Sequence, residues 1–350
     1  MNTDPLRTNP DFSQFLKVLR REGRPDHLPF YEHITTRQFM IDRLGISTQE
    51  LTNAGPDYWR LYVEFWIGMG YDCVPVESPM RFPLRKRERT SARSHGSEAS
   101  ALIHSWAEFE SYAWPDLSSP IDFTPFEQIT KHLPDGAKMV AGCGGGPFEW
   151  TSRIMGLEGL STALCEAPDL FEAVLAKIRE RHLSGLRQLA SMDAVGALRQ
   201  GDDLGFKTST FLAPTYLREY YLPIYKEMTD ASHAQGKPFI LHSCGNLEAV
   251  YDDLIDVCGI DAKHSFEDVV MPVAKFKEKY GQRVTPLGGL DVDFVCRASE
   301  EELRAYTRRN IDQCFHDGYW ALGTGNSLTD YMPVRNYMIV LEEAIRYTGR

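Results

Sequence analysis

The sequence lacks the features that mark membrane and secreted proteins. It contains no apolar run near the ~20 residues that cross a bilayer, and its start, Met1-Asn2-Thr3-Asp4-Pro5, has no basic and apolar leader. The seven cysteines are scattered without the close spacing of a disulfide framework, which is typical of reduced thiols. We therefore expect a cytoplasmic protein that makes no contact with a membrane.

Positive charge is also scarce. The chain has 38 lysine and arginine residues against 49 aspartate and glutamate residues, which gives a net charge of -11 at pH 7. Phosphate backbones are bound by concentrated positive charge, and the one basic run, Arg85-Lys86-Arg87-Glu88-Arg89, is short and of mixed sign, as in solvated loops. These features argue against nucleic acid as a partner and favour a small-molecule substrate.

The composition that remains is that of a globular protein, with 43% hydrophobic and 25% charged residues. The 350 residues can form one domain, because α/β barrels routinely exceed about 250 residues. From about residue 136 onward, short apolar runs alternate with segments of helical period, which predicts βα units around a parallel sheet. The predicted strands cover residues 137–142, 194–198, 238–242, 259–262, 284–287 and 319–322.

Amphipathic segments fill the gaps between these strands. Residues 169–190 place their apolar side chains mostly on one stripe, which predicts a helix packed on the outside of a sheet. A second helix is predicted over residues 213–235, with a break or kink at Pro223. The last helix is predicted to open at Asp330, as its N-cap, with Pro333 close behind.

The first third of the chain is less regular. Helices are predicted over residues 12–19, 58–68 and 125–132, and strands over residues 28–31 and 72–76. The basic and serine-rich stretch from Met80 to Ser111 is predicted to be a hairpin insertion. The whole pattern predicts one α/β domain over residues 1–350, a (β/α)8 TIM barrel with an N-terminal helical extension; the oligomeric state stays open.

The segment His242-Ser243-Cys244 closes one of the predicted strands. In parallel barrels the loops after the C-terminal ends of the strands form the active face. Residues two apart on an extended strand point to the same side, so the imidazole and the thiolate can converge on one ion, and zinc suits this pair. Because two ligands do not make a site, a buried histidine beside an inert thiol is the alternative.

Other predicted strand ends supply further polar side chains. Glu267, after the strand at 259–262, is the best placed additional metal ligand, with His264 as the alternative. Asp202 and Asp203 follow the strand at 194–198, where a carboxylate could bind substrate or hydrogen-bond to a metal ligand. The alternative for these two residues is a helix or loop cap.

Two glycine-rich segments also follow predicted strands. The backbone N–H groups of residues 142–147 could cradle an anion, although a tight strand-to-helix turn explains this segment as well. The second segment, residues 323–327, closes the last strand, and glycines such as Gly325 would let the backbone approach a ligand over the barrel mouth.

Several sequence blocks, taken in order, resemble the uroporphyrinogen decarboxylase superfamily, which includes methylcobamide:thiol methyltransferases. The resemblance covers most of the chain and rests on the ordered set rather than on one block. The blocks are residues 24–30, 146–156, 201–205, 214–223, 242–246, 288–291 and 323–326.

The sequence departs from the decarboxylases of this superfamily at two places. Where they carry an arginine-rich block for the substrate carboxylates and an essential aspartate, this chain has Thr36-Arg37-Gln38-Phe39 and Val76-Glu77-Ser78-Pro79. Without these groups, the negative charges of such a substrate lack bidentate partners. The resemblance therefore favours the methyltransferase branch.

The resemblance to that branch implies a zinc ion held by His242 and Cys244, with Glu267 as an oxygen ligand. A third sulfur is expected after the last strand, where this chain has Asn326, while Cys314 lies upstream in a predicted helix. A corrinoid on a partner protein is implied as the source or receiver of the methyl group.

In this scheme Asp202 orients the substrate, Glu267 completes the coordination of the zinc or exchanges in it, and Asn326 contacts the ligand or the metal. Asp203, Gly325 and Asp291 contact the cofactor. Two alternatives stay open. One is a cofactor-free decarboxylase of uroporphyrinogen or a related carboxylated substrate, and the other is a non-catalytic barrel that binds a corrinoid or another small molecule.

Overall fold

A parallel sheet forms the centre of the molecule. The computed structural model describes residues 6, 9–55, 57–84 and 101–349, and six strands lie in chain order, each hydrogen-bonded in parallel to the next. They are β1 (Cys73–Pro79), β2 (Lys138–Gly144), β3 (Val195–Gly201), β4 (Phe239–His242), β5 (Ala262–His264) and β6 (Thr285–Leu287).

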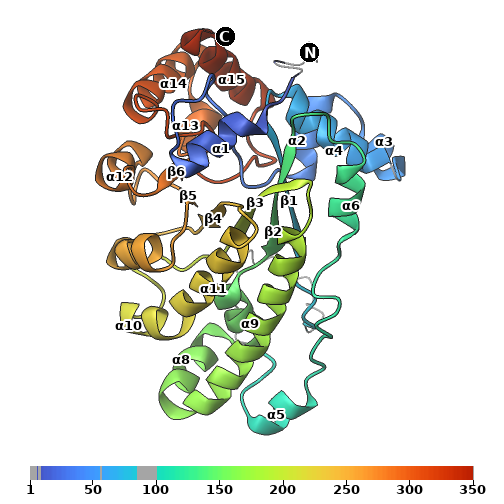
Figure 1. Cartoon of the computed structure of the whole chain (residues 1–350), viewed down its shortest axis with the longest axis vertical. Coiled ribbons are helices and arrows are strands. Elements are labelled where there is room, and N and C mark those ends of the chain that lie inside the picture. Colours follow the sequence, from blue (N-terminus) through green and yellow to red (C-terminus); the bar gives the residue numbers. More distant parts are fainter. Residues whose placement is uncertain (1–5, 7–8, 56, 85–100, 350) are drawn as a thin grey trace.

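Short bridges continue the sheet beyond β6 toward the start of the chain. Leu287 pairs in parallel with Ala321, and Leu322 pairs in parallel with Phe30. The segments around residues 30 and 321 thus take the places of the first and last strands of an eight-stranded barrel. The predicted (β/α)8 barrel is confirmed, with the strands at the centre of Figure 1 and helices around them.

Small and branched side chains fill the interior of the barrel. Cys73, Val140, Ala197, Ile240 and Ala262 come from successive strands and form one buried cluster with Tyr31, Leu287 and Ala321. The predicted N-terminal helix, α1 (Phe12–Arg20), adds its apolar face to this cluster, with Asp11 as its N-cap. Because α1 packs at the start of the strands, the open end of the barrel is the one where the strands finish.

The remaining helices surround the barrel. The predicted helix over 169–190 is confirmed as α9, which contacts β2 and β3. The helices are α2 (Arg37–Leu44), α3 (Thr48–Asn53), α4 (Asp57–Gly68), α5 (Trp106–Ser111), α6 (Thr124–Thr130), α7 (Pro147–Met155), α8 (Leu157–Glu166), α9 (Pro168–Ala190), α10 (Pro214–Tyr216), α11 (Leu222–His233), α12 (Val273–Tyr280), α13 (Val292–Arg297), α14 (Glu300–Cys314) and α15 (Val334–Thr348), with the shorter η2 (Leu217–Tyr221), η3 (Glu248–Val250) and η4 (Asp253–Val257).

Three local predictions have different outcomes. The interruption expected at Pro223 is present, because π-helical η2 ends just before α11, whose first turn contains the proline and needs no N–H there. The prediction of Asp330 as an N-cap is wrong, since α15 begins at Val334 and Pro333 occupies the N-cap position, without a side-chain hydrogen bond to the helix. Half of the predicted hairpin, residues 85–100, lies outside the described residues, and its last part is helix α5.

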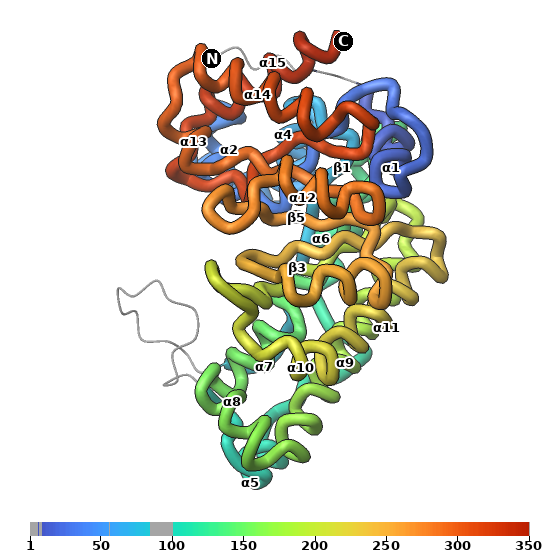
Figure 2. The backbone as a smooth tube through the Cα atoms, turned by 90° about the vertical axis from the view of Figure 1, so that its left-hand side faces the viewer, coloured from blue at the N-terminus to red at the C-terminus, as the bar shows by residue number. Residues whose placement is uncertain are grey.

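The molecule is longer in one direction than in the others. Helices α14 and α15 lie at one end, and α5 and α8 lie at the other end (Figure 2). Among the described residues, no helix combines the length and the apolar character that a membrane crossing requires.

Candidate active site

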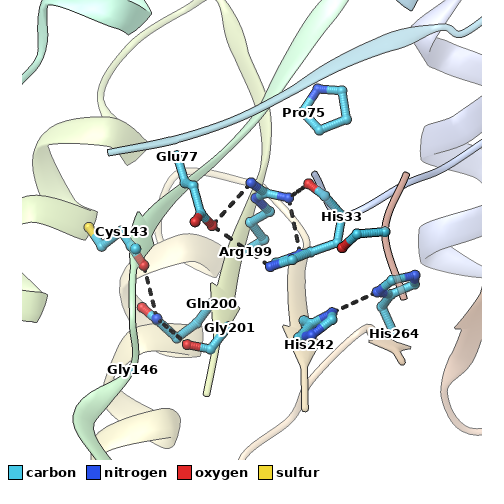
Figure 3. Close-up of polar contacts among 12 residues, drawn as sticks. His33, Pro75, Glu77, Cys143, Gly146, Arg199, Gln200, Gly201, His242 and His264 are labelled. Carbon is cyan, nitrogen blue, oxygen red and sulfur yellow. Dashed lines mark hydrogen bonds and ion pairs between the residues drawn. The ribbon is translucent and has the colours of Figure 1, made fainter. Parts of the chain in front are cut away.

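The C-terminal ends of three neighbouring strands bring their polar residues together. In the sheet register Gly201 at the end of β3 lies opposite His242 of β4, which lies opposite His264 of β5. The two imidazoles therefore project side by side into the barrel mouth, where Figure 3 shows them with His33, which follows the first strand. Chain order around the barrel thus builds a histidine cluster from three distant parts of the sequence.

The predicted pair, His242 and Cys244, is in contact. The Nε2 atom of His242 lies 3.7 Å from the Sγ atom of Cys244. The hydroxyl of Ser265 donates to the same sulfur at 3.3 Å, and the Nδ2 atom of Asn326 lies 3.7 Å from it. Asp203 accepts the backbone N–H of Cys244 at 3.0 Å. Cys244 is therefore the meeting point of the loops after β3, β4, β5 and the last strand.

The donor atoms of Asp203, His242 and Cys244 fit a metal ion. One donor atom from each lies within 4.8 Å of the others. Zinc–nitrogen and zinc–sulfur bonds of about 2.0 and 2.3 Å at a tetrahedral angle put nitrogen and sulfur about 3.5 Å apart. The observed separation of 3.7 Å matches this value, so little rearrangement is needed to hold the ion.

A second group, formed by His33, His242 and His264, also has one donor atom from each residue within 4.8 Å of the others. However, the rings of His33 and His242 stack, with centroids 3.8 Å apart and an angle of 18° between the planes. The lone pair of an imidazole nitrogen lies in the ring plane, so stacked rings point their lone pairs in parallel and cannot share one ion. We therefore place the candidate metal site at Cys244.

Burial controls the charge of this pair. It raises the pKa of the Cys244 thiol to about 12, and the Asp203 carboxylate acts in the same direction. Burial also lowers the pKa of His242 well below its ordinary value, with a smaller contribution from His264. A neutral imidazole is ready to bind a metal, whereas the thiol needs a neighbouring cation to become a thiolate.

Two charged residues hold the third histidine of the cluster. The buried guanidinium of Arg199 donates to the backbone carbonyl of His33 and lies 3.0 Å from its Nδ1 atom. The same guanidinium lies 3.2 Å from a carboxylate oxygen of Glu77 (Figure 3). Neither His33 nor Arg199 was predicted as a site residue, and Glu77 stood out only as the replacement for an aspartate.

Asp202 lies away from the pair, despite being next to Asp203. Its carboxylate accepts the backbone N–H groups of Phe148 and Glu149, both at 2.9 Å, at the start of α7, and it also accepts the hydroxyl of Tyr225. The side chain is 1% exposed, and burial, followed by the charge of Glu149, raises its pKa to about 8. The N–H groups that bind this carboxylate thus belong to the start of α7, directly after the glycine-rich segment 142–147.

Glu267, Gly325, Asn326 and Asp291 all line one pocket of about 230 Å³. Asn326 connects this pocket to Cys244, while Glu267 lies in the pocket rather than in the three-residue donor group. Asp291 caps α13 by accepting the N–H of Phe294 at 2.8 Å. A Cβ atom at Gly325 would lie 2.1 Å from the backbone oxygen of Phe266, so only glycine fits there.

A buried lysine that the sequence analysis did not identify interacts electrostatically with Cys244. Lys263 is 2% exposed, and its ammonium hydrogen-bonds to the carbonyl of Ser265 and lies 4.1 Å from the centre of the Phe266 ring. Burial lowers its pKa to about 7, against the opposite effects of Cys244 and Glu267. A lysine directly after a predicted strand carries no sequence signal that separates it from an exposed one.

The fold and the site define a class of protein, a TIM barrel with a polar, metal-competent cluster at the mouth where barrel enzymes carry out their chemistry. A comparison with protein families extends this result. The family model described as uroporphyrinogen decarboxylase (URO-D) matches residues 94–347. The chain belongs to the uroporphyrinogen decarboxylase family.

Solved structures with the same fold include a methyltransferase from Methanosarcina mazei. The two structures superpose with a TM-score of 0.70 at 16% identity, over 96% of this chain and 98% of the other. A Listeria monocytogenes protein assigned as a vitamin-B12 independent methionine synthase gives a TM-score of 0.52 at 14% identity, over 93% of this chain and 100% of the other. A search of curated protein sequences gives no significant match. At these identities the structural similarity establishes the fold.

Proposed function

We propose that this chain is a zinc-dependent methyltransferase that moves a methyl group between a corrinoid on a partner protein and a small thiol or other acceptor. The observation that carries the proposal is the 3.7 Å approach of His242 Nε2 to Cys244 Sγ, with the carboxylate of Asp203 beside them. The similarity in fold to a methyltransferase from Methanosarcina mazei supports it.

The residues of the site would divide the work as follows. His242, Cys244 and Asp203 would hold zinc, which when bound lowers the pKa of a coordinated thiol and so makes it a better nucleophile. Asp203 also fixes the backbone of Cys244 through its N–H group. Asp203 would thus contact both the zinc ion and the backbone of Cys244, which keeps the sulfur at the end of β4 in a constant position relative to the mouth.

The pocket beside Asn326 would receive the acceptor. Its volume of about 230 Å³ suits a small molecule, and its lining includes the carboxylate of Glu267 and the amide of Asn326. The amide lies between the pocket and the sulfur. We therefore assign Glu267 and Asn326 to the orientation of the acceptor, and Asp202 to the support of α7 behind the site.

Metal analysis of the purified protein tests the proposal. We expect about one zinc ion per wild-type chain and loss of zinc from His242→Ala and Cys244→Ala. Cys165→Ala is the matched control, because this cysteine is exposed on α8 and should leave zinc content unchanged. The wild type should also demethylate methylcobalamin in the presence of a small thiol. The change in the absorption spectrum of the corrinoid measures this reaction. Equal, low zinc in the wild type and in His242→Ala would refute the proposal.

The family match favours one second candidate, a decarboxylase that acts on uroporphyrinogen or a related carboxylated substrate without a cofactor. Such a substrate needs free guanidinium groups, and Arg199 at the mouth is already engaged by Glu77 and His33. Incubation of the protein with uroporphyrinogen and measurement of carboxylate loss distinguishes the two activities. Absence of both activities would instead support a non-catalytic binding barrel.

A further inference from the structure

The hydrogen bonds of the histidine cluster determine where each ring carries its proton. The backbone carbonyl of Thr324 lies 3.3 Å from Nε2 of His264, and a carbonyl can only accept. His264 therefore carries its proton on Nε2. The ring is fully buried, and among the described residues no carboxylate hydrogen-bonds to it. A buried charge without such a partner is costly, so the ring is neutral and its Nδ1 atom can only accept.

This assignment determines the state of the next ring. The Nδ1 atoms of His264 and His242 lie 2.7 Å apart, so one of them must donate. Because His264 accepts, His242 carries its proton on Nδ1, and its Nε2 atom has a free lone pair. That lone pair belongs to the atom 3.7 Å from the sulfur of Cys244.

The third ring is held from the opposite side. Arg199 is always a donor, and its guanidinium lies 3.0 Å from Nδ1 of His33. His33 therefore carries its proton on Nε2, which lies 3.7 Å from a carboxylate oxygen of Glu77. The ring nitrogens of His33 are thus directed at Arg199 and Glu77, while its flat face covers the ring of His242.

We propose that His264 is a positioning residue that, together with the Thr324 carbonyl, holds His242 in the Nδ1–H tautomer and presents its Nε2 lone pair beside Cys244. The consequence for metal binding rests on the proposed function, whereas the tautomer itself does not. Free imidazole populates both tautomers, and a hydrogen bond to the second nitrogen is what selects the one that binds metal.

Nitrogen-15 NMR of the histidine side chains tests the tautomer directly. In the metal-free wild-type protein at neutral pH, we expect long-range proton–nitrogen correlations of the Nδ1–H type for His242 and of the Nε2–H type for His264. The two signal sets are assigned by their loss in His242→Gln and His264→Asn. A proton on Nε2 of His242, or a doubly protonated ring, would overturn the proposal.

Variants at position 264 test the positioning role. In His264→Leu the acceptor for His242 is absent, so we expect mixed tautomers and zinc affinity lower by about 10- to 100-fold. In His264→Asn the amide oxygen can accept at the place of Nδ1, and most of the affinity should return. His33→Leu is the matched control, because it removes a buried histidine that packs on His242 by stacking. Equal losses of affinity in all three variants would contradict a role through the hydrogen bond.

The two measurements separate this inference from the proposed function. A wild-type protein with the Nδ1–H tautomer and no affinity for zinc would refute the zinc proposal and leave the positioning assignment standing. Tight zinc binding by a protein whose His242 carries its proton on Nε2 before metal is added would refute the positioning assignment and leave the zinc proposal standing. If His264→Leu fails to fold, the wild-type spectrum still decides the assignment.

Discussion

The side chain at position 326 determines how many strong donors can surround the proposed zinc ion. Asn326 lies where the resemblance to the methyltransferases places a third sulfur, and its Nδ2 atom is 3.7 Å from Cys244 Sγ. Two thiolates on one tetrahedral zinc lie about 3.8 Å apart, given zinc–sulfur bonds of about 2.3 Å. Asn326→Cys therefore introduces a thiol close to the position that a third strong ligand would occupy.

The size of the effect follows from known zinc sites. Four ligands contribute about 10–16 kcal/mol of apparent binding free energy at pH 7, or about 2.5–4 kcal/mol for each ligand. Because about 1.4 kcal/mol corresponds to a tenfold change in affinity, one added thiolate should tighten zinc binding by about 100- to 1000-fold. The amide that it replaces is exposed, so its removal should have little opposing effect.

Competition titration with a chromophoric zinc chelator under reducing conditions measures this change. Asn326→Ser is the matched control, since serine has the size of cysteine but a much poorer donor for zinc. We expect Asn326→Cys to bind zinc far more tightly than both Asn326→Ser and the wild type. If the cysteine variant binds zinc no better than the serine variant, the ion is not held at Cys244 as we propose.

Three further predictions address other residues. Asp203→Asn keeps an oxygen for the N–H of Cys244 but loses the charge, so zinc affinity should fall by about tenfold or more while thermal stability changes little. Asp291→Ala removes the N-cap of α13 and should lower the free energy of unfolding by about 1 kcal/mol in urea, with zinc content unchanged. Burial raises the pKa of Glu32 from 4.5 to about 7. The carboxyl of the unfolded chain therefore loses its proton at a lower pH than that of the folded chain, so the free energy of unfolding should fall by about 3 kcal/mol as the pH rises from 4.5 to 7. Glu32→Gln should remove that slope, and an unchanged pH dependence of urea unfolding would contradict the assignment.

The contact between His242 and Cys244 could be predicted because it depends on local geometry. The two residues are separated by one position at a strand end, and an extended backbone directs them to the same side whatever the rest of the fold does. The barrel itself could be predicted from alternating strand and helix periods, because this pattern repeats along most of the chain. Both inferences use information that is local or repeated.

The different positions of the Asp202 and Asp203 carboxylates could not be predicted in this way. Adjacent residues on extended backbone point to opposite sides, so only one of the two carboxylates can face the mouth. The start of α7 and the hydroxyl of Tyr225 receive Asp202, and both come from other parts of the chain. The sequence shows two candidate carboxylates, and long-range packing chooses between them.

His33 and Arg199 show a second limit. His33 lies just beyond a predicted strand, so the rule that identified His242 would have found it if it had been applied to the first strand. Arg199 lies within a strand, and its burial at 1% exposure becomes intelligible only when Glu77 and the carbonyl of His33 are seen to surround its guanidinium. A buried charge is tolerated only with such partners, and these come from two other parts of the chain.

The charges at the mouth help to separate the activities that family membership leaves open. A polycarboxylate substrate needs free arginine side chains, whereas Arg199 is bound within the cluster and the carboxylates of Glu77 and Asp203 lie nearby. The same carboxylates favour a cation, and the neutral rings of His33 and His242 add no positive charge that would repel it. Burial lowers the pKa of Lys263 to about 7, which reduces the positive charge of the one ammonium described near Cys244. The described part of the mouth is thus better suited to hold a metal ion than a polyanion, which is why we prefer methyl transfer over decarboxylation.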